Sequence, residues 1–92
     1  MAERSVRPED VLPDQEDFKT IKGVRVRKGT IFAAMQNMEI LDSGTPEEKS
    51  AAKATIKELA PGLVALGMRR HFICRNPEVQ QILDEAAKDL GL

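Results

Sequence analysis

The fold is decided by residues 45–66, which read TPEEKSAAKATIKELAPGLVAL. Thr45 can cap a helix through its side-chain oxygen, and Pro46 suits the first helical position. Glu48 stands three residues after the threonine, which is the spacing of a capping box, in which the two side chains each bond to the other residue's backbone N–H. This stretch therefore predicts that a helix begins at Pro46.

The same run carries the apolar stripe that a helix needs in order to pack. Three large aliphatic residues and one alanine recur three or four residues apart in this stripe: Ala52, Ile56, Leu59 and Leu63. Pro61 stands within the run, and proline inside a helix removes one backbone donor and crowds the preceding turn. We therefore expect a helix near 46–66 with a kink or break at Pro61.

Two more helices are predicted on either side of this run. Thr30 is the predicted N-cap of a helix near 30–42, in which apolar residues again recur at helical spacing. Asn76 followed by Pro77 repeats the pattern of a cap and an N-terminal proline, and predicts a helix near 77–90.

An alternating pattern replaces the helical one between Phe18 and Arg27. Two short runs of period two flank Lys22-Gly23, which predicts a β-hairpin near 18–27. A two-stranded hairpin is marginal alone, so its apolar face must pack on the helices. Residues 69–74 are short for a helix and alternate imperfectly, which leaves open a third short strand beside the hairpin. The predicted fold class is α+β, mostly α.

Charge divides the chain more sharply than the net charge of −1 indicates. Residues 1–17 contain six acidic and two basic residues, whereas residues 18–30 contain five basic residues and no acidic one. The first residues are also poor in apolar side chains and lack a helical or alternating pattern. We expect residues 1–15 to form a flexible acidic arm and residues 16–92 to form a single small globular domain.

Basic residues gather in two segments of the chain, and we call these segments the basic islands. Their candidate anion-binding or partner-binding residues are Arg25, Arg27, Lys28, Arg69, Arg70 and Arg75. The islands would form one patch if residues 69–74 lay beside the hairpin. The balanced net charge and the acidic last helix argue against nucleic acid as the partner. Anion or nucleic-acid binding is therefore kept as the second function that the sequence allows, after association.

The sequence offers little for catalysis. His71 and Cys74 are the only imidazole and the only thiol, and a metal site needs three or four ligands. On a strand these two side chains would point to opposite faces, which argues against a Cys–His pair. We expect no enzymatic activity, no metal and no cofactor.

Association is the function that the sequence favours. The candidate self-association residues are Phe32, Met35, Met38 and Met68. The expected partner is a second copy, giving a homodimer, or an unidentified protein. No run of 18 apolar residues and no apolar leader is visible, so we expect no membrane association and a cytoplasmic location.

Overall fold

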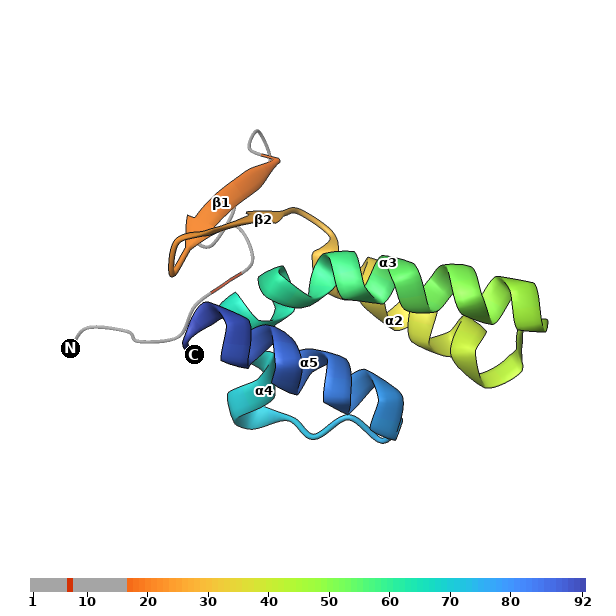
Figure 1. Ribbon diagram of the computed structural model, residues 1–92. Coiled ribbons are helices and arrows are strands. Elements are labelled where there is room, and N and C mark those ends of the chain that lie inside the picture. The colour runs from red at the N-terminus through yellow and green to blue at the C-terminus, as the bar shows by residue number, and fades with distance from the viewer. Residues whose placement is uncertain (1–6, 8–16) are drawn as a thin grey trace.

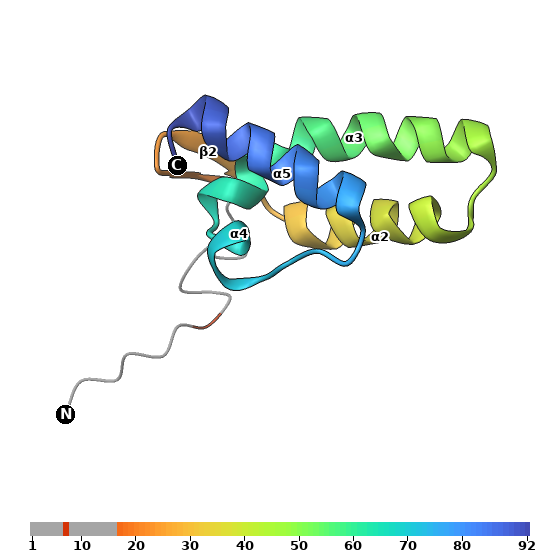
Figure 2. The same cartoon turned by 60° about the horizontal axis from the view of Figure 1, so that its bottom comes forward.

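The computed structural model describes Arg7 and residues 17–92. The predicted arm at 1–15 thus lies outside the described residues, Arg7 excepted. The described elements, in chain order, are β1 (Phe18–Ile21), β2 (Val24–Arg27), α2 (Thr30–Ser43), α3 (Pro46–Ala65), α4 (Met68–His71) and α5 (Pro77–Leu90). α2 and α5 lie along α3, and the hairpin lies at the C-terminal end of α3 (Figures 1 and 2). The α+β, mostly α class is confirmed.

The core lies where α2 and α5 pack against α3. Its buried members are all aliphatic: Ala34, Ile56, Ala60, Leu63, Val64, Val79, Ile82, Leu83 and Ala87. Ile56 and Leu63 of α3 are the largest of its completely buried side chains, together with Leu83 and Val79 of α5. Each such side chain contributes about 1.5–3 kcal/mol when fully removed from water. α3 is therefore the element on which the rest of the fold is built.

The capping box at the start of α3 is confirmed. The backbone N–H of Glu48 donates to Thr45 Oγ1 at 3.2 Å, and the backbone N–H of Thr45 donates to Glu48 Oε1 at 2.8 Å. The helix is not broken at Pro61 but continues to Ala65. Proline removes only the bond to the carbonyl of Lys57, and Lys57 is exposed, so solvent can satisfy that carbonyl.

The hairpin closes through a two-residue turn and packs on α3 as expected. Ile21 pairs with Val24, and the turn residues Lys22 and Gly23 have φ values of 50° and 81°. Positive φ at both positions is typical of the hairpin turn that matches the strand twist. Val26 of β2 is buried, and the hairpin packs against the last turns of α3.

A third strand near 69–74 is wrong. Met68–His71 form the short helix α4, and the sheet has only β1 and β2 among the described residues. The turn begins after Gly67, whose φ of 92° is left-handed, and it closes when the Phe72 N–H donates to the Met68 carbonyl at 2.8 Å. The segment that follows runs along the side of the helices away from the hairpin, where no strand is available for pairing (Figures 1 and 2).

The start of α2 also differs from the prediction. Gly29, with φ of 85°, is the N-cap, and Thr30 is already the first helical residue. The Thr30 hydroxyl donates to the carbonyl of Arg27 at 2.7 Å instead of capping the helix. The chain must turn sharply between β2 and α2, and glycine adopts the left-handed conformation that this turn requires.

Candidate functional site

The aromatic side chains of this protein lie at its surface. Phe18, Phe32 and Phe72 are 43 %, 67 % and 68 % exposed, and they are the only aromatic residues in the chain. Phenylalanine has more apolar area to bury than any aliphatic side chain of this core. All three therefore leave much of this apolar area in contact with solvent.

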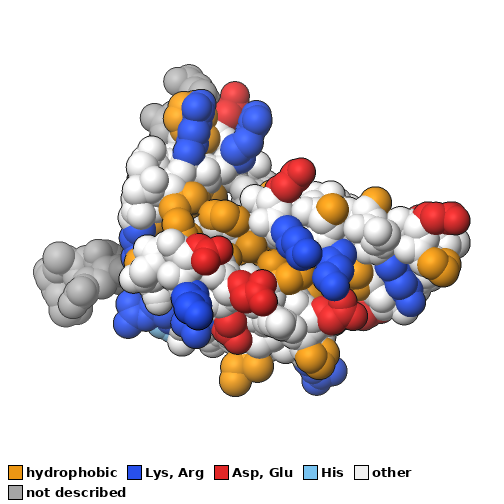
Figure 3. Space-filling view, in the orientation of Figure 1, with side chains coloured by type: hydrophobic (Ala, Val, Ile, Leu, Met, Phe, Trp, Pro, Cys, Tyr) orange, Lys and Arg blue, Asp and Glu red, His pale blue; other side chains and the backbone are white. Residues whose placement is uncertain are grey.

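The connection between α4 and α5, residues 72–76, carries the two most exposed large apolar side chains of the described residues. Ile73 is 88 % exposed beside Phe72. Hydrophobic side chains project from the lower edge of the molecule in Figure 3, where Figure 1 places this connection. An isolated exposed apolar residue is ordinary, but two large neighbours on one short connection form a distinct apolar projection.

Hydrogen bonds to α5 hold this connection in place. The backbone N–H of Cys74 donates to Gln80 Oε1 at 2.7 Å. Gln80 Nε2 donates to Asp84 Oδ1 at 3.0 Å, and the same oxygen accepts from Arg69 Nε at 2.7 Å. The connection is thus tied to α5 from both sides, by Arg69 before it and by Cys74 within it. Phe72 and Ile73 are held outward between these two anchors.

α2 carries two further exposed apolar side chains, Phe32 and Met35. At 100° per residue, Met35 lies on the same flank of the helix as Met38. Met38 is half-buried and packs against the core, and Cys74 of the connection packs against the same core. We define the association surface as Phe32 and Met35 of α2 together with Phe72 and Ile73 of the connection.

The structure divides the four predicted self-association residues into two pairs. Phe32 and Met35 are exposed, whereas Met38 and Met68 are half-buried against the core. Sequence reasoning missed Phe72 and Ile73, because the pattern of their segment leaves open whether it is a strand. A pair of large apolar residues between two helices was the signal that could have identified them.

The six predicted basic residues do not form one patch. Arg25 and Arg27 occupy alternate positions of β2, opposite in orientation to buried Val26, and the Arg25 guanidinium carbon lies 3.5 Å from the centroid of the Phe18 ring. Lys28 follows β2, with its backbone N–H donating to the Asp17 carbonyl at 2.6 Å, and exposed Arg75 lies on the α4–α5 connection.

The other two predicted basic residues, Arg69 and Arg70, do meet the hairpin. They line a hollow of about 370 Å³ together with Lys22, which lies in the hairpin turn. We call this site the basic hollow. The hairpin contributes only Lys22 to this hollow, a turn residue that sequence reasoning did not include among the candidates.

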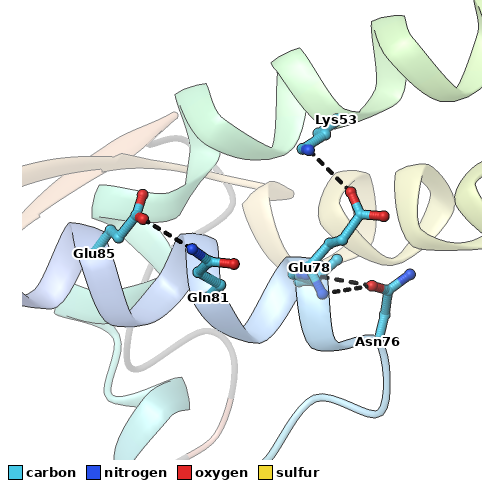
Figure 4. A network of polar contacts seen from close by, with 6 residues as sticks. Lys53, Asn76, Glu78, Gln81 and Glu85 are labelled. Carbon is cyan, nitrogen blue, oxygen red and sulfur yellow. Dashed lines mark hydrogen bonds and ion pairs between the residues drawn. The ribbon is translucent and has the colours of Figure 1, made fainter.

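Two ion pairs fix α5 against its neighbours. Lys53 Nζ of α3 lies 2.9 Å from Glu78 Oε2, close to where Asn76 caps α5 (Figure 4). The hydrogen bond and the charge of Lys53 lower the pKa of the Glu78 carboxyl group below its usual value. Hydrogen bonds from Arg69 and then Gln80 lower the pKa of Asp84 in the same way. Both carboxylates are exposed, so these pairs orient elements more than they stabilise the fold.

His71 and Cys74 do not form a pair in the structure. His71 ends α4 and is exposed, whereas Cys74 is half-buried and packs against the core. No group of three His, Cys, Asp or Glu side chains within the described residues is arranged to hold a metal ion. No helix in the part of the chain that the structure describes is both long enough and apolar enough to cross a membrane.

The chain was compared with protein-family models, with curated proteins and with solved structures. None of the three comparisons found a significant match.

Proposed function

We propose that this protein is a non-catalytic association module and that its partner is a second copy of the same chain. The observation that carries the proposal is the exposure of Phe72 and Ile73 on a connection that hydrogen bonds tie to α5. A rigid apolar projection loses little conformational entropy when it is buried by a partner, and this supports a role in binding.

The size of the association surface agrees with a dimer that depends on concentration. Two copies would bring together eight large apolar side chains, four from each association surface. At about 1.5 kcal/mol for each, burying them contributes roughly 12 kcal/mol. Association costs about 4–15 kcal/mol in lost translational and rotational freedom. The two terms are of similar size, so we expect a reversible dimer.

The charges beside the surface favour a second copy as the occupant. Glu39 lies on α2 one helical turn beyond Met35, and Arg75 lies two residues beyond Ile73; both are exposed. A two-fold axis places the same surface opposite itself, so unlike charges at different points of the rim can face each other across it. A surface with an apolar centre and both signs of charge at its rim is suited to pairing with itself.

Sedimentation velocity over a wide concentration range tests the proposal. We expect the wild-type protein to shift from monomer to dimer as concentration rises, and Phe72→Ser to remain monomeric at concentrations where the wild type dimerises. Phe18→Ser is the matched control, because it makes the same change on the outer face of the hairpin, and it should dimerise as the wild type does. A wild-type protein that stays monomeric throughout, or equal losses in both variants, would contradict the proposal.

We propose the cytoplasm as the compartment of this protein. Its single, half-buried thiol is compatible with a reducing environment. Fractionation of cells that express the full chain tests this placement, and recovery of the protein outside the cytoplasmic fraction would overturn it.

A further inference from the structure

We propose that the basic hollow binds a phosphate-type oxyanion, held by Lys22 and Arg70 with Arg69 beside them. This proposal does not depend on self-association, since it concerns other side chains and a different kind of ligand. It adds a binding site for a small anion, or for the phosphate group of a larger molecule, to the surfaces described above.

The shape and lining of the hollow support an anion site. Its basic members come from the hairpin turn and from α4, and its other lining residues, Val64, Ala87 and Leu92, have apolar side chains. Val64 and Ala87 are themselves buried, so one wall of the hollow is the edge of the core. Charges beside an apolar wall are less well screened than charges surrounded by water, which strengthens their attraction for an anion.

The basic groups of the hollow are available for a ligand. The side chains of Lys22 and Arg70 make no hydrogen bond or ion pair within residues 17–92. Arg69 donates to Asp84 through Nε, and this bond fixes the orientation of the guanidinium group. The terminal N–H groups of Arg69 are not used in this bond and can donate to a ligand. Arginine suits a phosphate group because its planar N–H groups can donate two parallel hydrogen bonds to phosphate oxygens.

The identity of residue 22 provides a further argument. Its φ of 50° is the only positive value at a non-glycine residue in the described part of the chain. Asparagine, aspartate and glycine are preferred in such a hairpin turn, because other side chains are strained there. A lysine in this place accepts a small conformational cost and sets a positive charge at the mouth of the hollow.

The position of the basic side chains of Lys22 and Arg70 has a competing structural explanation. α5 ends at Leu90, and Ala87 of its last turn lines the hollow. The C-terminal end of a helix carries partial negative charge, which nearby cations stabilise. In that case Lys22 and Arg70 would strengthen the end of α5 and would bind no ligand, so the test must separate ligand binding from stability.

The test is an NMR titration of the ¹⁵N-labelled full chain with sodium phosphate, compared with sodium chloride at equal ionic strength. We expect saturable shifts of amides around the basic hollow with phosphate only. Lys22→Asn and Arg70→Gln should each weaken phosphate binding about tenfold, as the loss of one charge-assisted contact implies. Arg75→Gln removes the same charge outside the hollow and should change the affinity less than twofold.

Lys22→Asn keeps the test independent of folding. Asparagine suits the turn better than lysine, so this variant should be at least as stable as the wild type while it binds phosphate more weakly. The proposal is overturned if phosphate gives no saturable shifts beyond those of chloride. It is equally overturned if Arg75→Gln weakens binding as much as Arg70→Gln, or if the two hollow variants alter only the stability of the end of α5.

Discussion

The side-chain oxygen of Gln80 accepts a hydrogen bond from the backbone N–H of Cys74 at 2.7 Å, across the α4–α5 connection. The amide nitrogen of the same side chain donates to Asp84, which also accepts from Arg69. One glutamine on α5 therefore links the connection that carries Phe72 and Ile73 to the ion pair that positions α4. The association surface and the basic hollow are supported by the same short network.

Replacement of this glutamine should loosen the connection while the core stays intact. Gln80→Ala removes the acceptor of the Cys74 N–H, so we expect a loss of about 1 kcal/mol in the free energy of unfolding. We also expect faster hydrogen exchange at the Cys74 amide and a weaker dimer. Gln81→Ala, which removes an exposed bond to Glu85 on the same helix, is the control and should leave that exchange rate unchanged. Equal exchange at Cys74 in the two variants would show that Gln80 does not hold the connection.

Gly62 tests how closely the hairpin packs on α3. A methyl group added at this glycine would lie 3.6 Å from both Val26 Cγ1 and Thr30 Cγ2, which is ordinary van der Waals contact. Gly62 is helical, so Gly62→Ala should stabilise the protein by about 0.5–1 kcal/mol through the higher helix propensity of alanine. Gly62→Leu should destabilise it, because the larger side chain would push β2 away. Chemical denaturation measures both, and destabilisation by alanine would mean that the hairpin packs more tightly than described.

The capping box of α3 should contribute measurably to stability. Thr45→Ala removes the acceptor of the Glu48 N–H, and loss of such a cap costs about 0.5–2 kcal/mol. Thermal unfolding should show a lower Tm for this variant. Thr55→Ala changes a threonine inside the same helix, whose hydroxyl donates to the Ala51 carbonyl, and should leave the Tm unchanged or slightly higher. If both variants behave alike, the box does not determine where α3 begins.

The pH dependence of stability should depend in part on Asp84. Hydrogen bonds from Arg69 and Gln80 lower its pKa in the folded protein relative to about 3.9 in an unfolded chain. The stabilisation is therefore complete above the unfolded pKa and is lost as the pH falls toward the lower, folded pKa. The wild type should exceed Asp84→Asn in free energy of unfolding at neutral pH, and this difference should shrink below about pH 4 and at high salt. A difference that is independent of pH would rule out the ion pair as its cause.

Local patterns predicted most of the secondary structure, because those patterns reflect interactions between near neighbours. The Thr45–Glu48 box, Asn76 before Pro77 and the Lys22-Gly23 turn each depend on residues within one turn of the chain, and each is present in the structure. The prediction of a third strand was wrong because it depended on contacts between residues far apart in the sequence. A strand exists only with a partner, and nothing in residues 69–74 shows that they begin with a helical turn and then run along the side of the helices away from the hairpin.

By itself, the sequence determined the fold class, the starts of α3 and α5 and the hairpin, because periodicity and capping act locally. Only the tertiary structure decided that Phe72 and Ile73 are exposed, because burial depends on how the connection packs against the helices. The tertiary structure also decided which basic side chains lie close together. Lys22 and Arg70 are 48 positions apart by their numbers, and they share one hollow only because the hairpin and α4 both pack at the end of α3.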